Sequence, residues 1–138
     1  MNDFRETYMK TVKVMLSIVI ISIVIILLFN SRIYLITNET TRDILFKTRD
    51  EINIAGTVID RECENYYSGG AWHTRNNTYI LIGDKIYKID SLNVYNEYEL
   101  NDSVNLIWLK LEYKYIGIEQ EAFLVLDKDY NPINTILK

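Results

Sequence analysis

The chain has 138 residues and a single cysteine, Cys63, which excludes an intrachain disulfide and a cysteine-based zinc site. The net charge is −4, and residues 52–138 hold 8 Lys plus Arg against 13 Asp plus Glu. An acidic region without a basic stripe argues against nucleic-acid binding, because phosphate neutralisation supplies most of that affinity.

Residues 14–31, VMLSIVIISIVIILLFNS, are the first predicted element. They contain no charge, Pro or Gly, and thirteen of the eighteen are Ile, Leu, Val or Phe. As a helix they would extend about 27 Å, close to the roughly 30 Å hydrocarbon core of a bilayer. A buried soluble helix would be amphipathic or shorter. A cleaved signal peptide needs small residues where this segment has Phe29. We therefore predict one uncleaved transmembrane helix, a signal anchor.

The basic residues around this helix predict its direction. Three precede it (Arg5, Lys10 and Lys13) and two follow it closely (Arg32 and Arg42). The positive-inside rule then places the N-terminus in the cytoplasm, in a single-pass protein of the cell membrane. The predicted organisation is a cytoplasmic tail (1–13), a transmembrane helix (14–31), a juxtamembrane linker or short helix (32–51) and an extracytoplasmic small β domain (52–138).

In the linker, Asn38 or Thr40 can cap a short helix, and a solvated stalk is the alternative. After Ile52 the apolar residues recur with a period of two, which predicts strands. The segments TYILI and KIYKID flank Gly83-Asp84, a two-residue hairpin signal. In residues 91–101 Leu92, Tyr95 and Tyr98 recur every three positions, which predicts one helical turn or a packed loop.

The longest predicted strand, VNLIWLKLEYKYI, changes its apolar phase between Trp108 and Leu109. Such a change suggests that this strand curls or carries a bulge. AFLVLD follows as its hairpin partner. The predicted fold class is all-β or mainly β: one N-terminal transmembrane helix, then a small five-stranded OB-like or SH3-like barrel with a short helical turn.

The candidate binding site is the predicted loop ECENYYSGGAWHTRNN, which carries Tyr66, Tyr67, Trp72 and His73 around Gly69-Gly70. Long loops in compact domains are usually functional or disordered, and aromatic residues beside Gly and Asn are typical of contact surfaces. The alternative is that the aromatic side chains fold back onto the barrel or lie at the bilayer interface. We expect Trp72 to pack and Tyr66, Tyr67 and His73 to be exposed.

Nothing in the sequence predicts an enzyme, a metal site or a cofactor. Cys63 and His73 lack a third group that would lower the thiol pKa or orient the imidazole. We expect Cys63 to be a half-buried strand residue.

The sequence favours a non-enzymatic, membrane-anchored binding module on the outer side of the membrane. Its expected partners are the lipid bilayer and another membrane or envelope protein, with the oligomeric state left open. The alternative is a phage-type accessory protein, a holin-like lysis factor or a superinfection-exclusion protein, which acts through its helix. A composition rich in Ile, Asn, Tyr and Lys is typical of AT-rich genomes, so a phage or a low-GC bacterium is the expected source.

Overall fold

A computed structural model describes residues 2–30 and 32–138, with side chains described except at 27–30. Ser31, the last residue of the predicted span, lies outside the described residues. The chain divides into two compact units, Met1–Arg32 and Ile33–Lys138.

The first unit is the helix α1 (Asn2–Asn30), whose 29 residues include residues 2–13 of the predicted tail and residues 14–30 of the predicted span. It is long and apolar enough to cross a membrane. Its apolar side chains from Val14 to Ile26 are exposed, as contact with lipid requires. The hydroxyl groups of Ser17 and Ser22 donate to backbone carbonyls one turn earlier, at 2.9 and 2.8 Å. They are therefore satisfied within the helix, which removes most of the cost of placing them in hydrocarbon.

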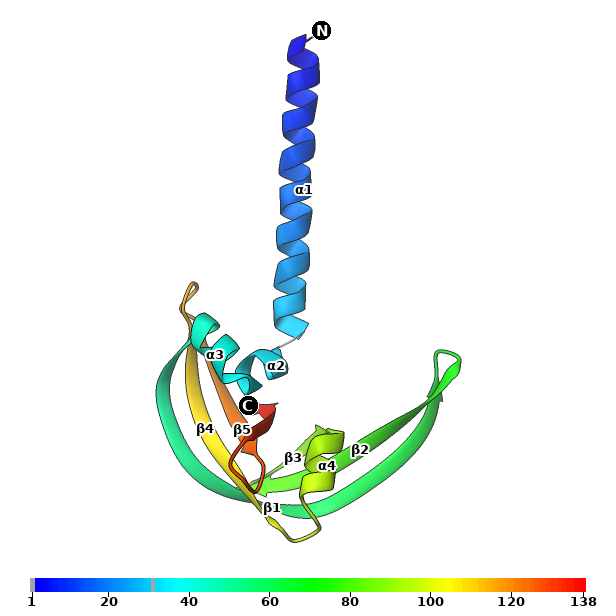
Figure 1. The fold of residues 1–138 in the computed structure, drawn as a ribbon, viewed down its shortest axis with the longest axis vertical. Helices are drawn as coiled ribbons and strands as arrows, with labels where there is room; N and C mark the ends of the chain where they lie inside the picture. Colours follow the sequence, from blue (N-terminus) through cyan, green and yellow to red (C-terminus); the bar gives the residue numbers. More distant parts are fainter. Residues whose placement is uncertain (1, 31) are drawn as a thin grey trace. The chain divides into compact units, whose positions relative to one another are not determined.

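The second unit is mainly β (Figure 1). Its elements are α2 (Arg32–Thr37), α3 (Glu39–Leu45), β1 (Phe46–Ser68), β2 (Ala71–Ile82), β3 (Lys85–Asp90), α4 (Leu92–Glu97), β4 (Ser103–Tyr113), β5 (Glu119–Leu126) and β6 (Pro132–Leu137). The strands form one curled antiparallel sheet, a half-barrel in the order β3-β2-β1-β4-β5-β6. The prediction of a mainly β domain is confirmed. The five-stranded OB-like or SH3-like barrel is not, because the sheet has six strands and ends at β3 and β6.

Strand β1 is long enough, at 23 residues, to pair with two different partners in succession. Its residues 46–57 pair with β4, and its residues 57–68 pair with β2. Register shifts between Thr48 and Asp50, and between Val58 and Asp60, mark bulges in β1. Bulges bend a strand and increase its twist, which explains how one strand follows the curl of the whole sheet.

The sheet is buried on both faces along β4. Successive residues of a strand point to opposite faces, and the side chains of β4 alternate between two apolar clusters. The first cluster joins one face of β4 to the α4 region: Val104, Leu106, Val94 and Tyr98. The second joins the other face to α2 and the start of β1: Leu109, Leu111, Ile36 and Phe46. Of the two explanations predicted for the change of phase, the bulge in this strand is wrong, because β4 keeps a continuous register with β5. The sheet is curled, and double-sided burial of β4 explains the change of phase.

Several local predictions are confirmed. The side chain of Asn38 caps α3 by accepting from the Thr41 amide at 3.1 Å. Ser91 caps α4, the predicted helical turn. Gly83-Asp84 connects β2 to β3. Residues 32–51 hold α2, α3 and the beginning of β1, and they contribute buried side chains to the second cluster.

Candidate functional site

The segment predicted as a long loop is a β-hairpin, which we call the arm: Asp60–Ser68 of β1 paired with Ala71–Tyr79 of β2. Only Gly69 and Gly70 connect the two strands, with φ of 60° and 82°. Positive φ at both central residues is what a type I′ hairpin turn requires. The predicted loop is therefore wrong, although the residues assigned to it remain together.

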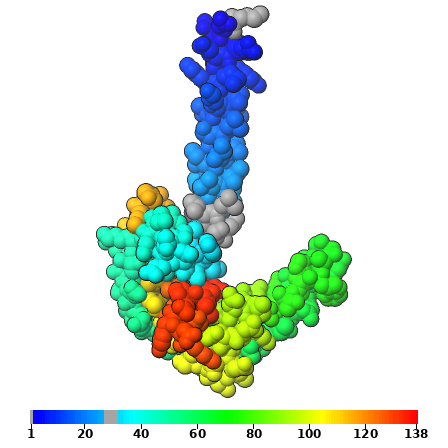
Figure 2. Space-filling view, in the orientation of Figure 1, coloured from blue at the N-terminus to red at the C-terminus, as the bar shows by residue number. Residues whose placement is uncertain are grey.

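The outer part of the arm is a two-stranded ribbon. Strand β4 pairs with β1 only as far as Thr57, and β3 pairs with β2 only from Asn77 onward. The arm therefore projects from the sheet, as the green hairpin in Figures 1 and 2 shows. A projection of this kind can reach a partner without moving the sheet that supports it.

The four predicted site residues form two cross-strand pairs next to the turn. Tyr66 lies opposite His73, with ring centroids 5.3 Å apart and nearly stacked planes. Tyr67 lies opposite Trp72, with centroids 5.5 Å apart and an edge-on contact. Directly opposed residues share a face of a ribbon and consecutive residues do not. The arm therefore carries one aromatic pair on each face.

The Tyr66–His73 pair is held by contacts within the arm. The guanidinium carbon of Arg75 lies 4.3 Å from the centroid of the Tyr66 ring. His73 Nε2 is 3.0 Å from the carbonyl oxygen of Ser68, so this nitrogen is the donor. Tyr66 is half-buried as a result, whereas His73 is exposed as predicted.

The Tyr67–Trp72 pair faces solvent. Tyr67 is 62% exposed and Trp72 is 74% exposed. The expectation that Trp72 packs is wrong, because the hairpin carries this side chain beyond the reach of the sheet. The uncharged residues that continue this face toward the base are Asn65, Thr74, Cys63 and Asn76, and Thr74 Oγ1 donates to Asn65 Oδ1 at 2.8 Å.

The opposite face of the arm is acidic. Asp60, Glu62 and Glu64 alternate along β1 on the side of Tyr66. Burial raises the pKa of the Tyr79 phenol, and these carboxylates raise it further. Arg75 lies opposite Glu64 on the neighbouring strand, and its positive charge offsets part of the negative charge of this face. The two faces of the arm thus differ in chemistry, one acidic and one neutral with exposed aromatic rings.

The base of the arm is fixed by Arg61, which the sequence did not single out. Its guanidinium carbon lies 4.0 Å from the centroid of the Tyr95 ring on α4. Its Nη1 is 3.2 Å from Glu99 Oε2. These contacts join the base of the arm to α4 and to the segment that follows it.

The geometry does not assemble a catalytic pair. Cys63 lies opposite Asn76 and is exposed, not half-buried as expected. His73 is on the other face of the ribbon, because it lies opposite Tyr66. A thiol and an imidazole on opposite faces cannot share a proton. Among the described residues, no group of three or more His, Cys, Asp or Glu side chains could hold a metal ion.

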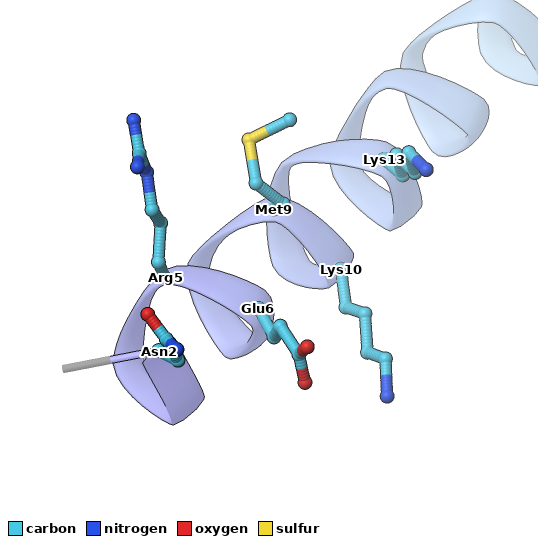
Figure 3. Close-up of a pocket in the computed structure, with 6 residues that line it drawn as sticks. All are labelled: Asn2, Arg5, Glu6, Met9, Lys10 and Lys13. Atoms are coloured by element: carbon cyan, nitrogen blue, oxygen red, sulfur yellow. The ribbon is translucent and has the colours of Figure 1, made fainter.

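A shallow hollow lies on α1, lined by Asn2, Arg5, Glu6, Met9, Lys10 and Lys13 (Figure 3). All six residues come from one exposed stretch of a single helix, so the hollow is a space between neighbouring side chains. Its three cations are those that predict the orientation of the helix. They suit contact with phosphate headgroups better than enclosure of a ligand.

No protein-family model, curated protein sequence or solved structure matches this chain. No activity or partner can therefore be transferred from a relative, and the function is inferred from the residues themselves.

Proposed function

We propose that this chain is a single-pass membrane protein whose β domain is a non-enzymatic binding module. The arm holds another membrane or envelope protein through Tyr67 and Trp72. The observation that carries the proposal is the exposure of this aromatic pair at the end of a ribbon that extends beyond its neighbours β3 and β4. The apolar helix α1 supports the anchoring part of the proposal.

The chemistry of the neutral face suits protein recognition. Tyr and Trp provide large contact areas with few rotatable bonds, and they dominate the binding energy of many interfaces. The neighbouring Asn and Thr side chains can donate and accept hydrogen bonds, as polar residues around such anchors do. The acidic face would repel a wrongly oriented acidic partner and thereby help to select the binding mode.

The domain lies on the outer side of the membrane in this proposal, and the single cysteine of the chain can test it. Cys63 is exposed on the arm, so a membrane-impermeant maleimide should label the wild-type protein in intact spheroplasts. The variant Cys63→Ser is the control for unspecific labelling. Labelling that appears only after lysis would show that the domain is cytoplasmic.

The binding site is tested by placing a photo-crosslinking amino acid at position 72 or 67 of the full-length protein in its native membrane. Tyr130 is a matched control, because it is also an exposed aromatic residue, 70% exposed, on the turn before β6. We expect one discrete adduct from positions 67 and 72 and none from position 130. Equal adducts from all three positions would show that the arm is not the site.

The contribution of the helix is tested separately by replacing residues 14–31 with an unrelated transmembrane segment. A binding module should keep its crosslink and its cellular effect on the foreign anchor. Loss of the cellular effect with an unchanged crosslink would point to the alternative, an accessory protein that acts through its helix.

A further inference from the structure

A second exposed apolar surface lies at the opposite end of β1 from the arm turn. We call it the tether-side patch: Ile44 on α3 and Tyr115, Ile116 and Ile118 on the turn between β4 and β5. These four side chains are between 57% and 81% exposed. The two segments are adjacent, because the Lys114 amide donates to the Leu45 carbonyl at 3.0 Å and Lys114 Nζ donates to the Asp43 carbonyl. Figures 1 and 2 show the turn beside α3.

The turn holds its apolar side chains in a defined position. The Gly117 amide donates to the Tyr113 carbonyl, and the Tyr113 amide donates to the Ile118 carbonyl, both at 2.9 Å. Gly117 has a φ of 68°, which a side chain would disfavour. Tyr113 packs on Phe46 with ring centroids 4.4 Å apart. The turn that carries three of the four patch residues therefore has a defined conformation, held by backbone hydrogen bonds and by ring packing.

We propose that the tether-side patch inserts into the interface of the bilayer that α1 crosses. This inference depends on the anchoring role of α1 in the proposed function. Only α2 and α3 separate the patch from the apolar helix, and Ile44 is twelve residues after Arg32. At a helical rise of 1.5 Å per residue these elements span about 20 Å at most. The tether thus keeps the patch close to the headgroups at a high effective concentration.

The composition of the patch suits lipid headgroups. Tyr and Lys beside Ile are typical of segments that lie at a membrane interface. The carboxylates that flank the turn are engaged, since Glu112 pairs with Arg49 and Glu119 with Lys110 at 3.7 Å. The exposed Asp43 has the Lys114 ammonium beside its carbonyl. The charges beside the apolar residues therefore balance, so this end would repel anionic headgroups less than the acidic remainder of the domain.

Docking at this end leaves the arm free. Phe46 pairs with Tyr113 at the first end of β1, whereas Ser68 ends β1 at the arm turn. The patch and the Tyr67–Trp72 pair are thus at opposite ends of one strand. Contact of the patch with lipid would fix the orientation of the domain on the membrane without covering the proposed binding site.

The test uses the full-length chain in vesicles of phosphatidylcholine and phosphatidylglycerol, with Cys63→Ser and one new cysteine that carries an NBD fluorophore. The label is placed through Ile116→Cys or Ile118→Cys. Tyr130→Cys is the exposed control within the domain. Ile20→Cys is the control within α1, and its quenching is measured with lipids that carry the doxyl group deep in the acyl chain. We expect blue-shifted emission at positions 116 and 118, and several times more quenching by shallow doxyl lipids than at position 130.

Quenching at positions 116 and 118 no stronger than at position 130, with strong quenching at position 20, would overturn the inference and leave the anchor intact. A blue shift at 116 and 118 without doxyl quenching would also overturn it, because protein and not lipid would then cover the patch. Absence of quenching at position 20 would refute the anchor itself and, with it, the basis of the inference.

Discussion

The two tryptophans of the chain allow a direct comparison between an exposed and a packed aromatic residue. Trp72 contacts Tyr67 across the ribbon and is otherwise in solvent, whereas Trp108 is half-buried against the first cluster. A cross-strand pair contributes roughly 0.2 to 1 kcal/mol, so Trp72→Ala should lower the melting temperature by about eight degrees at most. Loss of a core Trp costs about 3 to 5 kcal/mol, so the half-buried Trp108 should cost about 2 to 4 kcal/mol and at least roughly ten degrees.

The opposite ranking should hold for binding. Trp72→Ala should weaken partner capture by about 2 kcal/mol or more, roughly a thirtyfold change, as loss of an interface anchor does. Trp108→Ala should leave capture unchanged at temperatures where the domain is folded. Stability is measured by circular dichroism during thermal and urea unfolding. Partner binding is measured by titration with the purified partner that the crosslinking experiment identifies. Equal destabilisation by the two substitutions would refute the exposed position of Trp72 and the site built on it.

Three further predictions concern the stability of the β domain. Gly56→Ala should destabilise it by about 1 to 3 kcal/mol in urea unfolding, because the added Cβ would lie 2.7 Å from Cγ2 of the buried Ile80; a stability equal to wild type would contradict this. Residues 33–138 should give a soluble, β-rich monomer by circular dichroism, whereas residues 50–138 should not fold, since they lack the buried residues of α2 and the start of β1. Burial raises the pKa of the Tyr98 phenol, so the unfolded state loses this proton first and stability should fall as pH rises above about 10. Tyr98→Phe should reduce that pH dependence.

The features that were predictable from the sequence depend on local chemistry. Asn38 and Ser91 accept hydrogen bonds from amides three residues later, and Gly83-Asp84 forms a two-residue turn between apolar runs. The sixth strand, β6, escaped prediction because it begins with Pro132, a residue that argues against a strand. A proline is tolerated there because it is the first residue of an edge strand. The change of phase in β4 was visible, but burial of its second face depends on α2, which is remote from β4 in sequence.

The residues of the candidate site were predictable, and their conformation was not. An apolar alternation arises only where one face of a strand is buried, and the outer arm has no buried face. The sequence of its strands therefore resembles that of a loop. Gly69-Gly70 is a hairpin signal in itself, but its flanks lack the alternation that usually accompanies such a turn. The exposure of Trp72 depends on the length of the ribbon beyond β3 and β4, which no local pattern encodes.

The continuity of β1 has a mechanical consequence. The path from the apolar helix to the arm turn runs through α2, α3 and β1 alone, from Arg32 to Ser68. A partner held by the arm would thus pull on the membrane along a single covalent segment. Hydrogen bonds of an antiparallel ladder are perpendicular to its strands. Both ends of the pull would act on β1, so its covalent backbone would carry the tension, and its hydrogen bonds with β4 would resist only the straightening of this curled strand.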